Sequence, residues 1–337
     1  MDDTRGLTHL ALGNSLMAAG FDSSAFDQYL GSPNAVAFNA GLGSSYPVEH
    51  LILLRRALRD HSTINTVIYG FFDLQLTDNS AVTTSDLVGN RAASYYLEPD
   101  IALEYYRMSP RDRLAFELLR HVPMFVDRAA IWARVEQARR AMAQIGLPVV
   151  ATNRFGQVSD FALLEARSSA NFNGQCERAL RETPELSAPV RQIIRQSQAR
   201  GARVVIVEMP MSEYHRRTFY SVPGWVQYRD HVRALVEANG ATYVAASDWI
   251  ADPSEFADHL HLAPSGAQDF SRKLAVYCRT NKNARLASQR APNRRGCRQG
   301  VPPFGCPPDS CANTPAIRAW ASSWIRLRCS APRKLSA

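Results

Sequence analysis

The sequence lacks any long hydrophobic run. No stretch of about 18 apolar residues, the length that a membrane-spanning helix needs, occurs in its 337 residues. It also contains neither a G-x-G-x-x-G pattern nor a Walker A pattern, which disfavours a nucleotide-binding role. The first expected strand begins about seven residues after Met1, which leaves no room for a signal peptide. We therefore expect a soluble chain with no membrane contact of its own, in a compartment that the sequence leaves open.

Cysteine is scarce in most of the chain. Before residue 281 there are only Cys176 and Cys278, too few for a disulfide framework. The other four cysteines lie near the C-terminus, and their spacing does not form the paired Cys-x-x-Cys knuckles of a zinc site. The sequence thus predicts no metal and no organic cofactor.

Positive charge is also missing from most of the chain, although the net charge is +8. Residues 281–337 hold eleven Lys or Arg and one acidic residue, a charge of +10, so residues 1–280 carry −2. The main part therefore has no basic surface for a nucleic-acid backbone, and no nucleic-acid partner is expected. A role in nucleic-acid association through the basic tail is kept as an alternative.

Residues 281–337 differ in character from the rest. Seven prolines, scattered arginines and no sustained hydrophobic period predict a disordered tail. The composition also matches translation in a shifted reading frame, which sequencing across the Thr280 codon would test.

Apolar, strand-like runs alternate with helical stretches through residues 1–280. The predicted strands are 9–13, 35–41, 64–72, 203–209 and 242–246, and the helices with the clearest signals are 47–60, 225–239 and 264–278. Continuous apolar strands separated by helices are typical of a parallel sheet covered on both faces. We predict an α/β fold, a three-layer α/β/α sandwich with a flavodoxin-like parallel sheet of five strands in the order 2-1-3-4-5.

About 130 residues separate the third and fourth predicted strands, far more than one crossover helix needs. Residues 78–200 are therefore predicted to be an inserted helical subdomain or lid, with helices over 114–125, 129–145 and 189–199 and an irregular segment over 78–100. The insertion is interpreted either as a helical cover for the sheet or as a substrate-binding cap.

A candidate active site combines residues from the two ends of this pattern. Ser15 follows the first strand, and Asp258 and His261 follow the last one. A serine hydroxyl needs a base to remove its proton, and a histidine held by a carboxylate meets that need. In an open parallel sheet the carboxyl ends of the strands line one crevice, so these three side chains are expected to meet there. A distance above about 8 Å between Ser15 Oγ and both ring nitrogens of His261 would refute this site.

The motifs around these residues resemble those of the SGNH (GDSL-type) hydrolases. The Gly-Asp/Asn-Ser-Leu turn of that family is similar to residues 12–16 (LGNSL), and its second block is similar to 38–41 (FNAG). Its third block, Gly-x-Asn-Asp, falls at 70–73 (GFFD), and its last, Asp-x-x-His, at 258–261 (DHLH). The resemblance extends over about residues 7–278 in the correct order. Members with a degraded third block resemble bacterial cell-surface proteins that remove or transfer acyl groups on polysaccharides.

The resemblance implies a role for each matched residue. Ser15 would be the nucleophile, His261 the base and Asp258 the residue that orients it. The backbone N–H groups of Ser15 and Gly41 would form the oxyanion hole. Where the family has its oxyanion-hole Asn, this chain has Phe72, which offers no donor, so Asn39 is a further candidate. The implied activity is hydrolysis or transfer of an O-acyl ester through an acyl-Ser15 intermediate, with a small acyl ester or an acylated glycan as substrate.

Several alternatives stay open. His259 competes with His261 as the base, although its spacing from Asp258 disfavours it. Asp73 is either a turn carboxylate or a functional group, and His215 is a loop residue with a weaker case for substrate contact. The replacement at Phe72 leaves a second function class open, an inactive SGNH-like protein that binds glycan without chemistry.

Overall fold

The computed structural model describes residues 6–43, 45–78, 98–105, 109–121 and 168–290. These include five parallel strands in the order β2-β1-β3-β4-β5, which confirms the predicted sheet. The strands are β1 (His9–Gly13), β2 (Ala37–Asn39), β3 (Thr66–Phe71), β4 (Arg203–Glu208) and β5 (Thr242–Ala245). Every residue of β1 and β3 is buried, because both faces of the central strands are covered.

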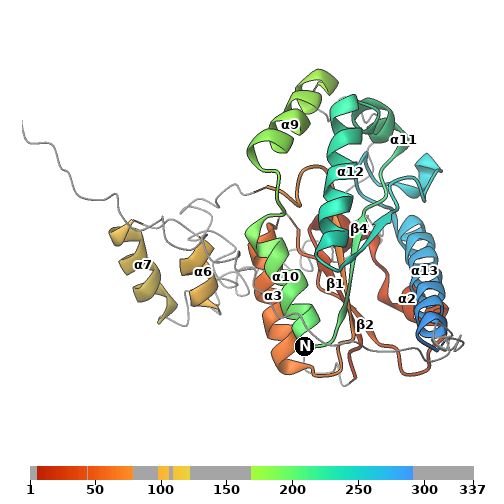
Figure 1. Ribbon diagram of the computed structural model, residues 1–337, viewed down its shortest axis with the longest axis horizontal. Helices are drawn as coiled ribbons and strands as arrows, with labels where there is room; N and C mark the ends of the chain where they lie inside the picture. Colours follow the sequence, from red (N-terminus) through yellow and green to blue (C-terminus); the bar gives the residue numbers. More distant parts are fainter. Residues whose placement is uncertain (1–5, 44, 79–97, 106–108, 122–167, 291–337) are drawn as a thin grey trace, which may run out of the picture. The chain divides into compact units, whose positions relative to one another are not determined.

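Helices lie on both sides of the sheet (Figure 1). Parallel strands are joined by right-handed crossovers, so the helices between β2 and β5 share one face. These are α3 (Pro47–Asp60), α10 (Ala188–Ala199) and α12 (Pro223–Ala238). The other face is covered by α2 (Ser23–Leu30) and α13 (Pro264–Arg290). The three-layer arrangement is therefore the predicted one.

The last helix is longer than the sequence pattern indicates. The prediction ended it at Cys278, where its hydrophobic period weakens, but α13 continues to Arg290. No glycine or proline interrupts the chain between Gly266 and Pro292, so nothing stops the helix before that proline. The predicted tail from residue 281 thus begins within a helix. Residues 291–337, where disorder is predicted, lie outside the described residues.

The insertion between β3 and β4 is described in part. The predicted helix at 114–125 corresponds to α7 (Pro110–Arg120), the one at 189–199 to α10, and a short helix α6 (Pro99–Tyr105) precedes α7. The predicted helix at 129–145 lies outside the described residues, as does 79–97 of the segment predicted to be irregular.

The helix α9 (Ser169–Glu182) of the insertion was missed by the sequence analysis. Its Phe172 packs against Trp225 of α12, with ring centroids 5.9 Å apart. Its first turn is capped by Ser168 Oγ, which accepts the Asn171 N–H at 3.1 Å. This end of the insertion therefore belongs to the hydrophobic core of the α/β domain.

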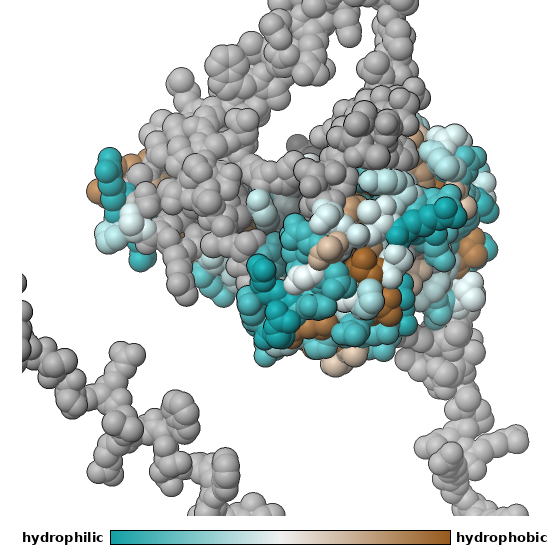
Figure 2. Space-filling view, turned by 90° about the horizontal axis from the view of Figure 1, so that it is seen from above, coloured by the Kyte–Doolittle hydropathy of each residue, from teal (hydrophilic) through white to brown (hydrophobic). Residues whose placement is uncertain are grey.

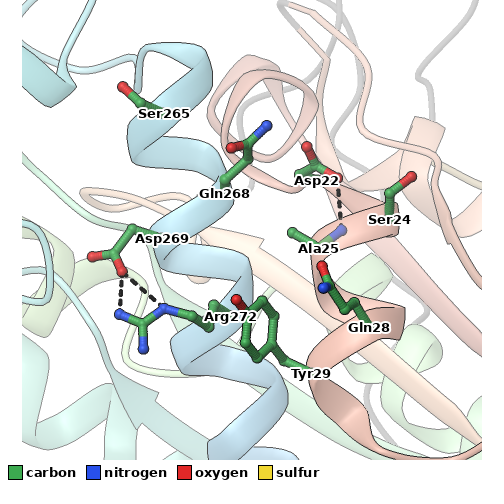
Figure 3. Close-up of a pocket in the computed structure, with 9 residues that line it drawn as sticks. All are labelled: Asp22, Ser24, Ala25, Gln28, Tyr29, Ser265, Gln268, Asp269 and Arg272. Atoms are coloured by element: carbon green, nitrogen blue, oxygen red, sulfur yellow. Dashed lines mark hydrogen bonds and ion pairs between the residues drawn. The ribbon is translucent and has the colours of Figure 1, made fainter.

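One face of the described part is largely polar. Figure 2 shows hydrophobic residues scattered among hydrophilic ones on one face. Between α2 and α13 lies a pocket of about 430 Å³ (Figure 3). The Arg272 guanidinium on its wall pairs with Asp269 and lies 6.0 Å from the centre of the Tyr29 ring. The pocket is lined by none of the residues predicted to be catalytic.

Candidate active site

The turn that carries Ser15 depends on a glycine. Gly13, the last residue of β1, has a φ of +154°. A Cβ atom at this position would lie 2.7 Å from the Gly70 carbonyl oxygen and 2.8 Å from Met17 Cβ. Only glycine lets β1 turn into α1 (Ser15–Gly20) this close to β3. Ser15 thus occupies the first position of a helix at the carboxyl edge of the sheet.

Asn14 fixes the start of that helix. Its side-chain oxygen accepts the Leu16 N–H at 2.9 Å, a normal N-cap interaction. The side-chain amide nitrogen donates to Gln75 Oε1 at 3.1 Å. Asn14 is 5% exposed, so both ends of its amide are engaged in a buried position. The turn before Ser15 is therefore held by the first turn of α1 and by the turn that follows β3.

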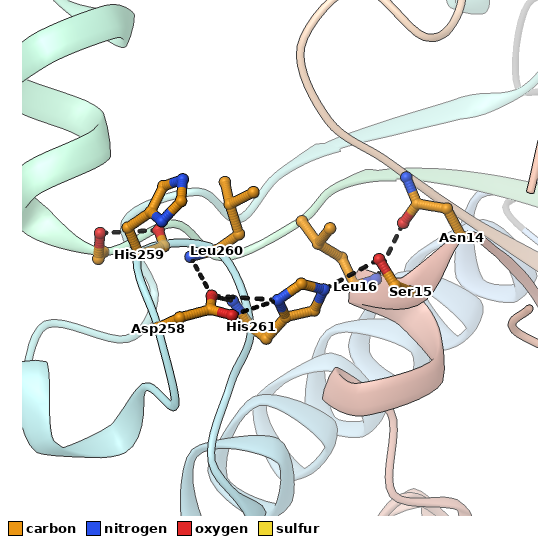
Figure 4. Close-up of polar contacts among 8 residues, drawn as sticks. Asn14, Ser15, Leu16, Asp258, His259, Leu260 and His261 are labelled. Carbon is orange, nitrogen blue, oxygen red and sulfur yellow. Dashed lines mark hydrogen bonds and ion pairs between the residues drawn. The ribbon is translucent and has the colours of Figure 1, made fainter. Parts of the chain in front are cut away.

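The three predicted catalytic side chains form one chain of hydrogen bonds. Ser15 Oγ lies 2.9 Å from His261 Nε2, although 246 positions separate the two residues. His261 Nδ1 lies 2.8 Å from Asp258 Oδ2 and 3.0 Å from Oδ1. Figure 4 shows the imidazole between the carboxylate and the start of α1. The Ser15–His261 distance is far below the limit that would have refuted the site, and the geometry is that of a nucleophile, a base and an orienting carboxylate.

Asp258 is held as an ionised carboxylate. Burial raises its pKa, but the His261 ring and the backbone N–H groups of His261 and Leu260 outweigh that effect and lower the pKa below its ordinary value of 3.8. The two N–H groups donate to Oδ1 at 2.7 and 2.8 Å. Asp258 and His261 are each 14% exposed at the side chain. A fixed negative charge beside Nδ1 orients the ring and stabilises an imidazolium.

The loop that presents these residues is closed on itself. Phe256 and Leu262 form an antiparallel bridge, and Ala257 N–H donates to the His261 carbonyl at 2.7 Å. From outside the loop, Ser212 Oγ donates to the carbonyl of His259 at 2.8 Å. The loop is thus fixed before α13 begins.

His259, the competing base, faces another part of the protein. Its ring lies roughly parallel to that of His215, with centroids 6.1 Å apart and planes at 22°. The structure therefore places His261, and not His259, against Ser15.

The expected oxyanion donors are only partly available. Ser15 is the first residue of α1, where a backbone N–H has no partner within the helix. Gly41 N–H, however, donates to Asn39 Oδ1 at 2.9 Å. The Asn39 amide nitrogen in turn donates to the carbonyls of Phe21 at 2.7 Å and Met17 at 3.0 Å. In this conformation the Gly41 N–H and the Asn39 amide group are engaged with each other and with the end of α1, and their expected role as oxyanion donors stays a prediction.

The third block has a different organisation from the expected one. Phe72 directly follows β3 and packs, partly buried, against the core. Asp73 is 7% exposed and has a φ of +46°, a backbone conformation that few residues other than glycine adopt. Its Oδ1 lies 3.2 Å from Nε2 of the fully buried His215. Asp73 and His215 thus form a buried pair.

One residue close to the site was missed by the sequence analysis. Gln75 lies in the turn after β3 and contacts Asn14, the neighbour of Ser15. The signal available in the sequence was a side-chain amide three positions after Phe72, close to the position where the family has its Asn.

Among the described residues, no group of three or more His, Cys, Asp or Glu side chains is arranged to hold a metal ion. Within the same residues, no helix combines the length and the apolar character that crossing a membrane requires.

Comparisons with known proteins give structural matches only. No family model and no curated protein matches the chain. Among solved structures it is similar to Est24, a carbohydrate acetylesterase from Sinorhizobium meliloti, at 12% identity over 83% of this chain and 99% of that one, with a TM-score of 0.36. It is also similar to an inhibitor-bound aryl esterase from M. smegmatis, at 11% identity over 81% and 99% of the two chains and a TM-score of 0.35.

A third similar structure is a lipase/acylhydrolase from Enterococcus faecalis, at 10% identity over 82% of this chain and 97% of that one, with a TM-score of 0.36. The identities and TM-scores are low, so the activity of this chain has to be argued from its own residues.

Proposed function

We propose that this protein is an SGNH-like serine hydrolase that cleaves or transfers an O-acyl ester through an acyl-Ser15 intermediate. The observation that carries the proposal is the continuous hydrogen-bonded chain from Ser15 Oγ through both ring nitrogens of His261 to the Asp258 carboxylate. Neutral His261 accepts a proton at Nε2 while Asp258 holds the other nitrogen in the donor form.

The reaction has two steps, acylation of Ser15 and transfer of the acyl group from Ser15. Ser15 Oγ forms a bond to the ester carbonyl carbon, its proton passes to His261 Nε2, and the carbonyl π electrons move to the oxygen. The carbonyl re-forms as the bond to the leaving alcohol breaks, and His261 returns the proton to that alcohol. Water or a second hydroxyl then attacks the acyl-Ser15 ester by the same route. Water makes the enzyme an esterase, and a sugar hydroxyl makes it a transferase.

A fluorophosphonate tests this proposal. The wild-type chain is expected to hydrolyse 4-nitrophenyl acetate and to gain one phosphonyl adduct, located at Ser15 by peptide mass spectrometry. Ser15→Ala is expected to lose both properties, whereas Ser32→Ala, at an exposed serine, is expected to keep both. An unlabelled wild-type chain that also shows no turnover would rule out the active hydrolase.

A second candidate function is binding of an acylated glycan without chemistry. It is favoured by the engagement of Gly41 N–H with Asn39, together with the absence of a donor at Phe72. Under this alternative the wild-type chain and Ser15→Ala would bind an acetylated oligosaccharide equally well, and neither would release acetate. The third alternative, nucleic-acid association through the basic tail, concerns residues that are almost all outside the described part of the chain and stays a prediction.

A further inference from the structure

The proposed reaction places a negative charge on the carbonyl oxygen, and the site must stabilise it. Preorganised hydrogen-bond donors supply much of that stabilisation in acyl transfer, and loss of one donor typically costs about 10²–10³ in rate. Ser15 N–H is one donor. The Gly41 N–H and the Asn39 amide are engaged elsewhere, and Phe72 offers none. A side-chain donor is therefore missing from the expected positions.

Gln75 is the candidate for a substitute, because its side-chain amide contacts Asn14, the residue before Ser15. It follows β3 at the carboxyl edge of the sheet, the edge at which α1 begins with Ser15. The turn that carries it is held by backbone hydrogen bonds, from Gln75 N–H to the Phe72 carbonyl at 3.2 Å and from Asp78 N–H to the Leu74 carbonyl at 3.1 Å. The side chain is half-buried and contacts the residue next to Ser15. It is thus a fixed amide beside the nucleophile.

The orientation of the Gln75 amide follows from its partner. Asn14 Oδ1 accepts the Leu16 N–H at 2.9 Å, and Asn14 presents its NH₂ group to Gln75. Gln75 must then meet Asn14 with its oxygen, as the 3.1 Å bond shows. The Gln75 NH₂ group is consequently on the other side of the amide. Among the described residues, no protein acceptor engages it.

We propose that Gln75 Nε2 donates the side-chain hydrogen bond to the oxyanion of the tetrahedral intermediate at Ser15, in place of the amide that is absent at position 72. The inference rests on the proposed function and adds a catalytic residue to it. Gln75 transfers no proton. It donates a hydrogen bond that strengthens as the carbonyl oxygen gains charge, so it lowers the barrier without tightening the binding of the ester itself.

Two replacements of Gln75 test the role. Gln75→Glu keeps an acceptor for Asn14 but loses the NH₂ donor, and Gln75→Met keeps the length of the side chain without polarity or charge. Both are expected to lower kcat for 4-nitrophenyl acetate by 10²–10³, with KM changed less than about threefold. Gln28→Met, at an exposed glutamine of α2, is the matched control and is expected to keep wild-type kcat.

A transition-state analogue separates this role from a structural one. A trifluoromethyl ketone forms a tetrahedral adduct with the serine, and its affinity is expected to fall in parallel with kcat in both Gln75 variants. A kcat within threefold of wild type, or a loss of kcat with unchanged affinity for the ketone, overturns the assignment of Gln75. If the wild-type chain turns over the ester and Ser15→Ala does not, either result leaves the hydrolase itself in place. An inactive wild-type chain would overturn both proposals.

Discussion

His215 Nε2 lies 3.2 Å from Asp73 Oδ1, with the His215 side chain fully buried and Asp73 nearly so. The pair links the end of β3 to the segment after β4. The backbone of Asp73 is strained, because its φ of +46° places a residue other than glycine in the left-handed region. Its backbone N–H donates to the hydroxyl of Tyr220 at 3.2 Å. These contacts hold the unusual backbone of the third block in place.

Replacing His215 is therefore expected to destabilise the fold. His215→Leu removes the donor and leaves the Asp73 carboxylate with one buried partner fewer, which should lower the free energy of unfolding by about 2–4 kcal/mol. His215→Gln keeps a side-chain donor and should lose less than half as much. Urea unfolding followed by circular dichroism measures both variants. Equal losses would show that the hydrogen bond to Asp73 contributes nothing to stability.

The sheet could be predicted from the sequence because each strand and helix is marked by a pattern within its own segment. The apolar run at β1 and the helix α3 with Pro47 at its start have the predicted bounds, and the strand order also agrees. The meeting of Ser15, His261 and Asp258 could be predicted as well, because Ser15 follows the first strand and Asp258 and His261 follow the last. Strand ends of one parallel sheet meet at one edge whatever lies between them.

The hydrogen bonding of the candidate oxyanion donors could not be predicted, because it depends on individual side-chain orientations and, for Gln75, on a contact between segments far apart. Nothing in residues 38–41 shows that Asn39 Oδ1 captures the Gly41 N–H. Likewise, the contact of Gln75 with Asn14 joins two loops 61 positions apart. The length of α13 was underestimated for a simpler reason: the hydrophobic period ends before the helix does.

Substitution of Gly41 is expected to disturb the nucleophile without touching it. A Cβ atom there would overlap the backbone nitrogen of Ala18 and lie 2.8 Å from its Cα, so α1 would have to move. Gly41→Ala should cost about 2 kcal/mol or more of stability and should lower turnover, because α1 carries Ser15. Gly174→Ala, in α9 with nothing within 4 Å, should instead stabilise by about 0.5–1 kcal/mol. Thermal unfolding and ester turnover of the two variants make the comparison, and a Gly41→Ala protein equal to wild type would contradict the packing argument.

His50 should make stability depend on pH. It is fully buried between Ser45 Oγ at 2.6 Å and the Tyr69 hydroxyl at 3.0 Å, and burial lowers its pKa from 6.5 to about 3. Between these two values the unfolded chain binds a proton at this site and the folded chain does not. The free energy of unfolding should therefore fall as the pH drops from about 6.5 toward 3, by up to about 1.4 kcal/mol per pH unit.

A variant series isolates that contribution. His50→Gln should reduce the dependence on pH over this range, whereas His121→Gln, at an exposed histidine, should leave it unchanged. The measurement is urea unfolding at intervals from pH 7 to pH 4. The same slope in wild type and in His50→Gln would show that His50 is not the buried neutral group.

The Asp258 carboxylate should contribute both to the rate of ester turnover and to the stability of the fold. Asp258→Asn keeps an oxygen for the N–H groups of Leu260 and His261, so the loop should remain closed. An amide, however, can neither fix the ring with Nδ1 as donor nor stabilise the imidazolium. We expect kcat to fall by about 10⁴, while the melting temperature at neutral pH falls by only the small amount that the charge contributes to stability.

The contribution of Asp258 to the stability of the fold should decrease in acid. The pKa of Asp258 is lowered from 3.8 in the folded chain, so the stability that its charge contributes is complete above that value and is lost as the pH falls through the lower folded pKa. The difference in stability between wild type and Asp258→Asn should therefore shrink in acid. Asp252→Asn, at an exposed aspartate that caps the short helix Pro253–Glu255, is the control for rate and should retain full turnover. Because the folded loop is retained, a fall in kcat of less than tenfold for Asp258→Asn would mean that His261 does not depend on this carboxylate for its orientation.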